Sequence, residues 1–321
     1  MPNIRAIDLF CGAGGSSWGA RQAGAEIVAG FDMWELAGKT YKDNFPKARF
    51  YPGRLEDLDV QAVARDLGQI DLLLASPECT NHSPARGNRP RCEASKATAF
   101  QVIRFARVFQ PRWIVIENVV SMRNWKRYEE FLDKLRNSPD LKYNVSVHTL
   151  VASDYGVPQA RRRLFILCDR EQEPSAPRRK PGTKKTAASV VDGNGSFPFT
   201  PLRTPRRAKA TIERAKRAIA ELGTRAPFLL VYYGSDHAGG WQRLDVPLRT
   251  LTTLDRFAYV RPNHAGHEMR MLQVPELKRA MGMQQRFRFM RGNRRERIHM
   301  IGNAVCPPVM KTIVKGLKTN G

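Results

Sequence analysis

Apolar residues gather in short runs along the first half of the chain, and stretches with helical spacing lie between these runs. Short apolar runs between turn residues are typical of buried strands, and apolar residues at every third or fourth position are typical of helices that cover a sheet. This alternation predicts an α/β fold, a mostly parallel sheet with helices on both faces. The predicted strands are 6–10, 26–31, 70–76, 113–117, 145–151 and 164–168. The predicted helices are 16–23 with Ser16 as a possible N-cap, 34–44, 60–67, 95–109 and 128–136.

The pattern changes after residue 169. Residues 171–185 (EQEPSAPRRKPGTKK) are rich in proline and basic residues, which is typical of a linker or an exposed loop. Residues 208–222 have the spacing of an amphipathic helix, which fits contact with a partner and fits equally a helix whose charged face is only solvated. Further strand patterns occur at 228–233 and 258–260, and helical patterns at 275–281 and 309–317. We expect a small second domain, followed by a helical tail.

The charge of the chain is extreme, with 54 Lys and Arg against 30 Asp and Glu and a formal net charge of +24. Such an excess favours a polyanionic partner, because neutralising phosphates releases counterions; a merely soluble basic protein is the alternative. The five cysteines are odd in number and follow no disulfide framework. With no signal peptide and no long apolar run, we expect a cytoplasmic protein with free thiols and no membrane contact.

A glycine-rich loop follows the first predicted strand. Residues 10–15 (FCGAGG) suit a nucleotide-type site, because glycines let the backbone approach a ligand closely. The loop lacks the G-x-G-x-x-G spacing of dinucleotide enzymes, and no Walker lysine follows it. Asp32, which ends the second predicted strand, could bind ribose hydroxyls. Loop and acid together favour an adenosine-containing cofactor such as S-adenosylmethionine.

A thiol and a carboxyl group follow two other predicted strands. Cys79 lies in a polar loop (residues 76–82, SPECTNH) after one strand, and Glu117 ends the next. At the carboxyl edge of one sheet they would form a nucleophile and acid pair, whereas a buried packing cysteine is the alternative. Cys79, His82 and Cys92 lack a fourth ligand for zinc, so we expect no metal. Cys11 and Cys168 are interpreted as packing thiols.

Five motifs occur in order along the chain: DLFCGAGG (8–15), SPEC (76–79), ENV (117–119), YGVPQARRR (155–163) and GNAV (302–305). Over nearly the whole chain, these motifs resemble those of the DNA cytosine-5 methyltransferases. The resemblance implies a Rossmann-like, S-adenosylmethionine-dependent methyltransferase fold that acts on double-stranded DNA, and a monomer suffices to flip one base out of the helix. It also implies a catalytic and cofactor-binding domain at 1–170, a linker and target-recognition domain at 171–262, and a C-terminal segment at 263–321 that packs back on the first domain.

The resemblance also assigns roles to single residues. Cys79 would add as a thiolate to carbon 6 of cytosine, and Glu117 would hydrogen-bond ring nitrogen 3 and the exocyclic amine. Arg161 and Arg163 would favour the thiolate, and Asn118 would hold the acid loop. The predicted cofactor-binding residues are Phe10, Gly12, Gly14, Gly15, Asp32 and Asn303. The predicted nucleic-acid-binding residues are Asn118, Gln159, Arg249 and Thr252, with Trp241, Arg243 and Thr250 as weaker candidates.

Two positions depart from the family pattern. Glu78 stands before the nucleophile, where the family usually has proline, and a carboxylate there would oppose thiolate formation unless it points away. Arg54 stands where the family commonly has an acid for the adenine amine, a role that Glu56 or Asp57 could take over. A methyltransferase that acts on RNA and a catalytically inactive DNA-binding relative are the rival functions.

Overall fold

The computed structural model describes residues 4–78, 93–182, 184–233 and 239–319. Cys79, His82 and Cys92 lie outside the described residues, as does most of the Gly-rich segment before Trp241.

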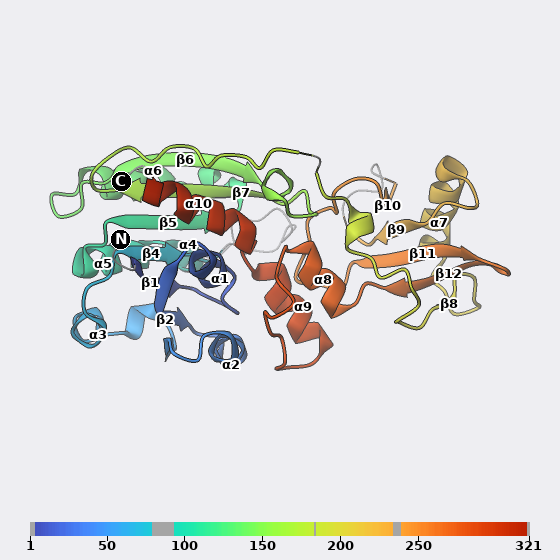
Figure 1. Ribbon diagram of the computed structural model, residues 1–321, viewed down its shortest axis with the longest axis horizontal. Coiled ribbons are helices and arrows are strands. Elements are labelled where there is room, and N and C mark those ends of the chain that lie inside the picture. Colours follow the sequence, from blue (N-terminus) through green and yellow to red (C-terminus); the bar gives the residue numbers. More distant parts are fainter. Residues whose placement is uncertain (1–3, 79–92, 183, 234–238, 320–321) are drawn as a thin grey trace.

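A seven-stranded sheet forms the core of the larger part of the molecule (Figure 1). Its strand order is β3-β2-β1-β4-β5-β7-β6. The first five strands in this order run parallel, whereas β7 runs antiparallel to both β5 and β6. The mostly parallel α/β sheet predicted from the apolar runs is therefore confirmed. The strands are β1 (Ile4–Leu9), β2 (Ala25–Asp32), β3 (Arg49–Pro52), β4 (Leu72–Ala75), β5 (Trp113–Asn118), β6 (Asn144–Val151) and β7 (Arg162–Asp169).

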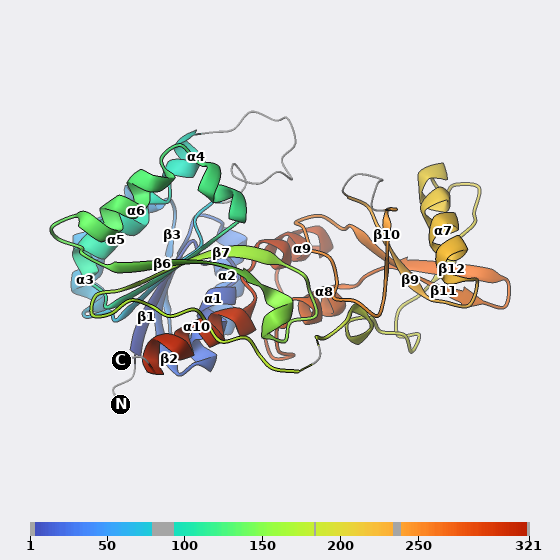
Figure 2. The ribbon, with the colours of Figure 1, turned by 90° about the horizontal axis from the view of Figure 1, so that it is seen from above.

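Helices cover both faces of this sheet and bury two separate apolar cores (Figure 2). One face carries α1 (Gly15–Gln22), α2 (Glu35–Asn44) and α10 (Pro307–Thr319); the other carries α3 (Val60–Leu67), α5 (Phe100–Phe109) and α6 (Tyr128–Asn137). The single helix predicted at 95–109 is in fact two, α4 (Glu93–Ala97) and α5.

The start of α1 differs from the prediction. Ser16 does not cap the helix: the N-cap is Gly14, in the left-handed conformation with φ 96°, and no side chain caps it. The carboxylate of Asp8, on β1, instead accepts hydrogen bonds from the backbone N–H (3.1 Å) and the hydroxyl (2.6 Å) of Ser17. A carboxylate from the neighbouring strand thus takes the place of a capping residue, because it satisfies an N–H of the first turn. A Cβ atom at Gly14 would lie 2.5 Å from the ring of Phe45, so the position also lacks room for a side chain.

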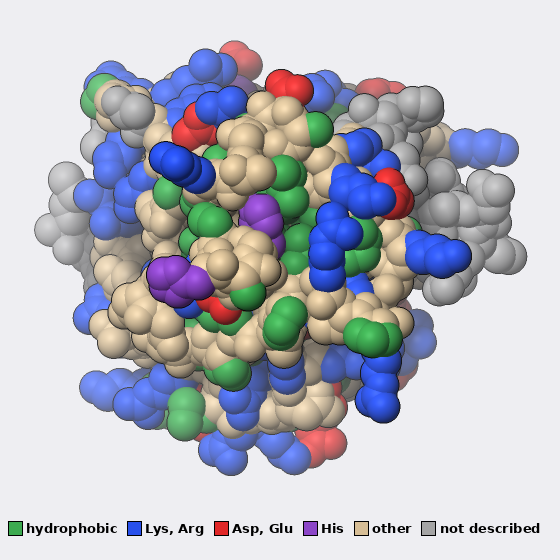
Figure 3. All heavy atoms as spheres, turned by 90° about the vertical axis from the view of Figure 1, so that its right-hand side faces the viewer, with side chains coloured by type: hydrophobic (Ala, Val, Ile, Leu, Met, Phe, Trp, Pro, Cys, Tyr) green, Lys and Arg blue, Asp and Glu red, His purple; other side chains and the backbone are tan. Residues whose placement is uncertain are grey.

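The second part of the molecule is a five-stranded antiparallel sheet of order β10-β9-β11-β12-β8, at the opposite end of the long axis from the first sheet (Figure 1). The α7 helix packs against one of its faces. Lys and Arg outnumber Asp and Glu on its end face (Figure 3). The sheet includes β12 and therefore extends beyond residue 262, the predicted end of the target-recognition domain. The elements are β8 (Thr200–Pro201), α7 (Lys209–Leu222), β9 (Phe228–Val231), β10 (Trp241–Arg243), β11 (Phe257–Asn263) and β12 (Gly266–Met271).

The C-terminal helices return the chain to the first sheet. Helices α8 (Val274–Ala280) and α9 (Arg294–Asn303) lie between the two sheets, and α10 packs against α1 (Figure 1). The α1–α10 contact is close, because a Cβ atom at Gly19 would lie 2.5 Å from the carbonyl oxygen of Pro307. The loop between α9 and α10 is thereby brought to the glycine-rich loop, where a Cβ atom at Gly15 would lie 2.5 Å from the carbonyl oxygen of Val305.

Candidate active site

A cavity of about 450 Å³ lies at the carboxyl ends of the parallel strands. Its walls come from the segments after β1, β2, β3 and β4, from Glu117 in β5, from Ser95 and Thr98 in and after α4, and from the end of α9. Open α/β sheets bind ligands at this edge, because the loops after adjacent strands converge there. Its lining includes five of the six predicted cofactor-binding residues and the predicted acid: Phe10, Gly12, Gly15, Asp32, Asn303 and Glu117.

Asp32 links the first two strand ends. Its carboxylate accepts hydrogen bonds from the backbone N–H groups of Gly12 and Trp34, both at 2.8 Å. Burial raises the pKa of Asp32, and these two hydrogen bonds oppose that effect. Gly12 has a φ of 51°, and a Cβ atom there would meet no other atom within 4 Å. The glycine loop thus leaves free space beside the Asp32 carboxylate.

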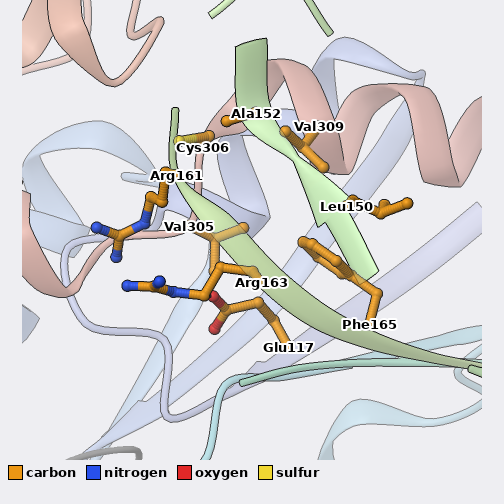
Figure 4. A pocket seen from close by; sticks show the side chains of 9 residues that line it. All are labelled: Glu117, Leu150, Ala152, Arg161, Arg163, Phe165, Val305, Cys306 and Val309. Atoms are coloured by element: carbon orange, nitrogen blue, oxygen red, sulfur yellow. The ribbon is translucent and has the colours of Figure 1, made fainter. Parts of the chain in front are cut away.

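Glu117 lies at the end of β5 with only 7% of its surface exposed. Its Oε1 is 3.2 Å from Nε of Arg163 on the adjacent strand β7 (Figure 4). Burial raises the pKa of Glu117, whereas the positive charges of Arg163 and Arg161 lower it. The carboxyl group therefore holds a proton more readily than an exposed glutamate does, while it stays paired with a cation.

Arg161 is buried, and its guanidinium group is directed at backbone carbonyls. It donates to the carbonyl oxygens of Leu251 (3.0 Å), Gly302 (2.8 Å) and Ala304 (3.3 Å). The carbonyl of Leu251 belongs to the segment between β10 and β11, and the carbonyls of Gly302 and Ala304 lie at the end of α9. Arg161 therefore holds both segments against β7, and its positive charge also reaches Glu117.

Asn118 joins the carboxyl ends of β4 and β5. Its side-chain amide donates to the carbonyl oxygen of Pro77 at 3.1 Å, and its side-chain oxygen accepts from the N–H of Val119 at 2.8 Å. Because Pro77 is two positions before Cys79, this contact sets the direction in which the chain enters the predicted nucleophile loop. The position of Cys79 itself lies outside the described residues.

The other residues predicted to bind nucleic acid belong to the junction between the two sheets. Gln159 is fully buried: its amide donates to the carbonyl of Ala280 (2.9 Å) and accepts from the N–H of Leu251 (3.0 Å). Contact between Gln159 and nucleic acid would require these bonds to open. Arg249 and Thr252 are half-buried in the segment on which α9 packs.

The thiols of Cys11, Cys168 and Cys306 are buried, and burial raises the pKa of each. Burial agrees with the packing role predicted for Cys11 and Cys168. A raised pKa keeps a thiol protonated, and the thiolate is the nucleophilic form. None of the described cysteines therefore has the environment of a nucleophile.

The sequence interpretation missed part of the cavity wall. It did not anticipate Met33 and Met300, which line the cavity together with Glu56 and Glu78, the two acids already singled out from the sequence. Glu78 and Ser95 share a hydrogen bond at the wall, so the Glu78 carboxylate faces this cavity. The signal that could have identified Met33 and Met300 is their position: Met33 follows the end of β2, and Met300 lies one helical turn before Asn303. Among the described residues, the wall contains four carboxylates (Asp32, Glu56, Glu78 and Glu117) and one guanidinium group (Arg54).

The described residues contain neither a membrane-spanning helix nor a metal-binding cluster. None of the helices in this part of the chain combines the length and apolar character needed to cross a membrane. Within the same residues, no three His, Cys, Asp or Glu side chains are grouped in a way that could hold a metal ion.

The sheet topology and the position of the cavity define a Rossmann-like methyltransferase fold. A prophage-encoded E. coli protein described as a DNA modification methyltransferase has a similar structure, with a TM-score of 0.71, 20% identity and 99% of each chain covered. The chain belongs to the family of C-5 cytosine-specific DNA methylases, whose family model matches residues 4–319.

Two named relatives illustrate the range of similarity. The type II methyltransferase M.AgeI of Thalassovita gelatinovora is 36% identical over 51% of this chain and 39% of its own length. The type II methyltransferase M.NgoPII of Neisseria gonorrhoeae is 25% identical over 98% of this chain and 95% of its own length. The chain spans about half or less of the length of several relatives that it matches.

Proposed function

We propose that the protein is a DNA cytosine-5 methyltransferase that uses S-adenosylmethionine as its methyl donor. The observation that carries this proposal is one continuous cavity, with Asp32 and the glycine loop in one part of its wall and Glu117 in another. A methyltransferase needs its donor and its target base in contact. A cavity that joins an adenosine-type site to a buried carboxyl group meets that requirement.

The charges of the cavity wall fit this donor. In a chain with a net charge of +24, the described part of the wall carries four carboxylates, of which Glu117 is paired with Arg163, and one guanidinium group. An acidic wall favours a cationic ligand and disfavours the phosphates of a dinucleotide or a nucleoside triphosphate. S-adenosylmethionine carries a positive sulfonium and a positive ammonium group. Asp32 would bind its ribose hydroxyls, and the space at Gly12 lets the ligand approach the backbone closely.

The raised pKa of Glu117 suits contact with cytosine. A protonated carboxyl group can donate to ring nitrogen 3, while its other oxygen accepts from the exocyclic amine. The hydrogen bond to nitrogen 3 stabilises the negative charge that develops on the ring when a nucleophile adds to carbon 6. Arg163, 3.2 Å from the carboxyl group, would keep it oriented.

Cys79 would supply that nucleophile as a thiolate. Its sulfur bonds to carbon 6, and the electron pair of the C5–C6 double bond moves onto carbon 5 and into the ring. When bound, S-adenosylmethionine would supply the methyl group for carbon 5 and would keep the bonding pair on its sulfur as a neutral thioether. A water molecule then takes the proton from carbon 5, the C5–C6 double bond forms again, and the Cys79 thiolate leaves. Asn118, through Pro77, would hold the start of the nucleophile loop against β5.

Double-stranded DNA is the proposed substrate, read by the second sheet and its flanking segments. Carbon 6 is stacked within a duplex, so the target base must be flipped out, at a cost of a few kcal/mol. Contacts between phosphates and the basic surface would offset part of this cost. Residues 171–262, extended to the end of β12, are the proposed target-recognition region.

The test is transfer of a labelled methyl group. The full chain is incubated with S-adenosylmethionine labelled in its methyl group and with a mixed-sequence DNA duplex. Parallel reactions contain single-stranded RNA or the Cys79→Ala variant. We expect label in DNA as 5-methylcytosine and none with Cys79→Ala. Label in RNA alone would reject the proposed substrate, and full transfer by Cys79→Ala would reject the proposed nucleophile.

A further inference from the structure

A run of arginines lies between α8 and the first turn of α9. Residues 284–297 (QQRFRFMRGNRRER) contain six arginines and one acidic residue. Arg286 and Arg288 are exposed, whereas Phe287 and Phe289 are buried and their rings contact each other, with 5.0 Å between the centroids. The buried rings thus anchor the segment, while the two arginines between and beside them face the solvent.

Polar contacts fix the backbone of this segment. The side-chain amide of Asn44, the last residue of α2, donates to the carbonyl oxygen of Arg288 at 2.9 Å and accepts from its N–H at 2.8 Å. Lys278 of α8 donates to the carbonyl oxygens of Gln285 (2.5 Å) and Phe287 (2.6 Å). Because the backbone is already held in place, a ligand of the arginines would not have to order it.

A third arginine, Arg21 in the last turn of α1, lies beside the same segment. Trp18 joins the two: the guanidinium carbon of Arg21 is 4.0 Å from the centre of its ring, and that of Arg286 is 5.7 Å from it. Burial lowers the pKa of Arg21, and so does the neighbouring charge of Arg286. An anion bound between these arginines would relieve the repulsion between their charges.

These three arginines, called the arginine surface below, are not neutralised by acids. Within the part of the chain that the structure describes, Arg21, Arg286 and Arg288 form no direct ion pair. The nearby acid, Asp43 in the last turn of α2, is paired instead with Arg291 at 2.8 Å. The arginine surface therefore has positive charge available for an external partner.

We propose that the arginine surface is a second contact surface for double-stranded DNA, separate from the cavity. Its guanidinium groups bind phosphates of a DNA segment that does not enter the cavity, and Arg21, Arg286 and Arg288 accordingly do not line that cavity. Several fixed guanidinium groups need several anionic groups at close spacing, which a nucleic-acid backbone provides. The inference goes beyond the proposed function and uses it only in the choice of DNA as the polyanion.

A membrane surface fits this segment less well. Peripheral membrane binding needs a broad apolar face next to the basic residues. Within residues 284–297, all of which the structure describes, Met290 is the only large apolar side chain that is exposed, at 69%. One methionine can contact the sugars beside a phosphate, but it does not form such a face.

Salt-dependent binding of the full chain to a mixed-sequence duplex of about 40 base pairs tests this surface without using activity. Fluorescence anisotropy of the labelled duplex gives the association constant between about 50 and 200 mM salt. Each phosphate contact adds about 0.9 to the magnitude of the slope of log K against log salt. In Arg286→Ser/Arg288→Ser we expect this magnitude to fall by about 2, and affinity at about 50 mM salt to fall at least about tenfold. Arg286→Lys/Arg288→Lys keeps both charges and should keep the slope.

Arg65→Ser/Arg136→Ser is the matched control, because it removes two exposed arginines from α3 and α6, which cover the opposite face of the sheet. It should change the slope by less than about 0.5. Equal losses in the two serine variants would overturn the assignment, because net charge alone would then explain them. An unchanged DNA slope in Arg286→Ser/Arg288→Ser would overturn it too, and loss of binding to phosphatidylglycerol vesicles in that case would assign the surface to a membrane. If the unmodified protein binds DNA through this surface but transfers no methyl group, the proposed function fails and this inference stands.

Discussion

Asp8 gives the structure a predicted sensitivity to pH. Its side chain is completely buried, and one carboxylate oxygen accepts from the N–H and hydroxyl of Ser17 at the start of α1. The other oxygen has no hydrogen-bond partner among the described residues. Burial raises the pKa of Asp8 from its ordinary value of 3.8 to about 7, and the charge of Asp32 adds to this effect. Replacement of Asp8 by asparagine keeps an acceptor for Ser17 and removes the titrating group.

The size and sign of the effect follow from proton linkage. Between pH 3.8 and about 7 the folded chain binds the Asp8 proton more tightly than the unfolded chain does. The stabilising contribution of this protonation is fully present below 3.8 and is lost as the pH rises through 7. At about 1.4 kcal/mol per pH unit, the whole rise in the pKa of Asp8 contributes about 4 kcal/mol to the free energy of unfolding. Of this, about 3 kcal/mol is lost between pH 5 and pH 8.

Urea unfolding of the unmodified protein and of Asp8→Asn at several pH values measures this loss. The difference between the two free energies of unfolding removes most contributions of other titrating groups. We expect this difference to move by about 3 kcal/mol in favour of Asp8→Asn from pH 5 to pH 8, and to stay flat above pH 8. Glu129→Gln makes the same chemical change at an exposed position and should show no such trend. A difference that is constant from pH 5 to pH 8 would refute the reasoning.

Three further substitutions test other contacts. Asn118→Ala removes the hydrogen bond to Pro77, so methyl transfer to DNA should fall about tenfold to a hundredfold. The dissociation constant for S-adenosylhomocysteine should change less than about twofold. Equal losses in transfer and in binding would contradict a role in the nucleophile loop. Glu276→Gln breaks a buried ion pair with Arg270, so chemical unfolding should show that the free energy of unfolding falls by about 3–5 kcal/mol. A loss below about 1 kcal/mol would rule this prediction out. Gly19→Ala should lower the free energy of unfolding by about 1–3 kcal/mol in the same assay, because its Cβ atom would lie 2.5 Å from a backbone oxygen. The control Gly193→Ala places its Cβ atom in open space and should be neutral. Equal effects of the two substitutions would argue against the α1–α10 contact.

The parallel sheet was predictable because its central strands are buried on both faces and therefore appear as continuous apolar runs. Strand β3 (RFYP) lies at the edge and is partly exposed, so it has no such run. Helix α9 (RRERIHMIGN) was missed because polar residues dominate it, although Ile298, Met300 and Ile301 are buried. Both elements depend on neighbours that are distant in the sequence, which a local apolar pattern does not reveal.

The site was predictable where chemistry coincides with a strand end. Asp32 and Glu117 end β2 and β5, and the topology then brings both to one cavity. The contacts of Arg161 were not predictable, because its carbonyl partners at Leu251 and Gly302 lie far along the chain and meet it only after α9 returns. A basic motif next to a strand predicted charge at the site, but it could not distinguish a residue that contacts substrate from one that holds backbone segments in place.

Covalent trapping on fluorinated DNA tests whether Cys79 is the nucleophile. A DNA duplex in which 5-fluorocytosine replaces cytosine is incubated with the full chain and S-adenosylmethionine, and the adduct is digested and analysed by mass spectrometry. Because fluorine at carbon 5 cannot leave as a proton does, the bond between sulfur and carbon 6 should persist after methyl transfer. We expect a methylated fluorocytosine adduct on the peptide that contains Cys79, formed only when S-adenosylmethionine is present. An adduct on another residue, or methyl transfer to ordinary DNA with no adduct on fluorinated DNA, would contradict it.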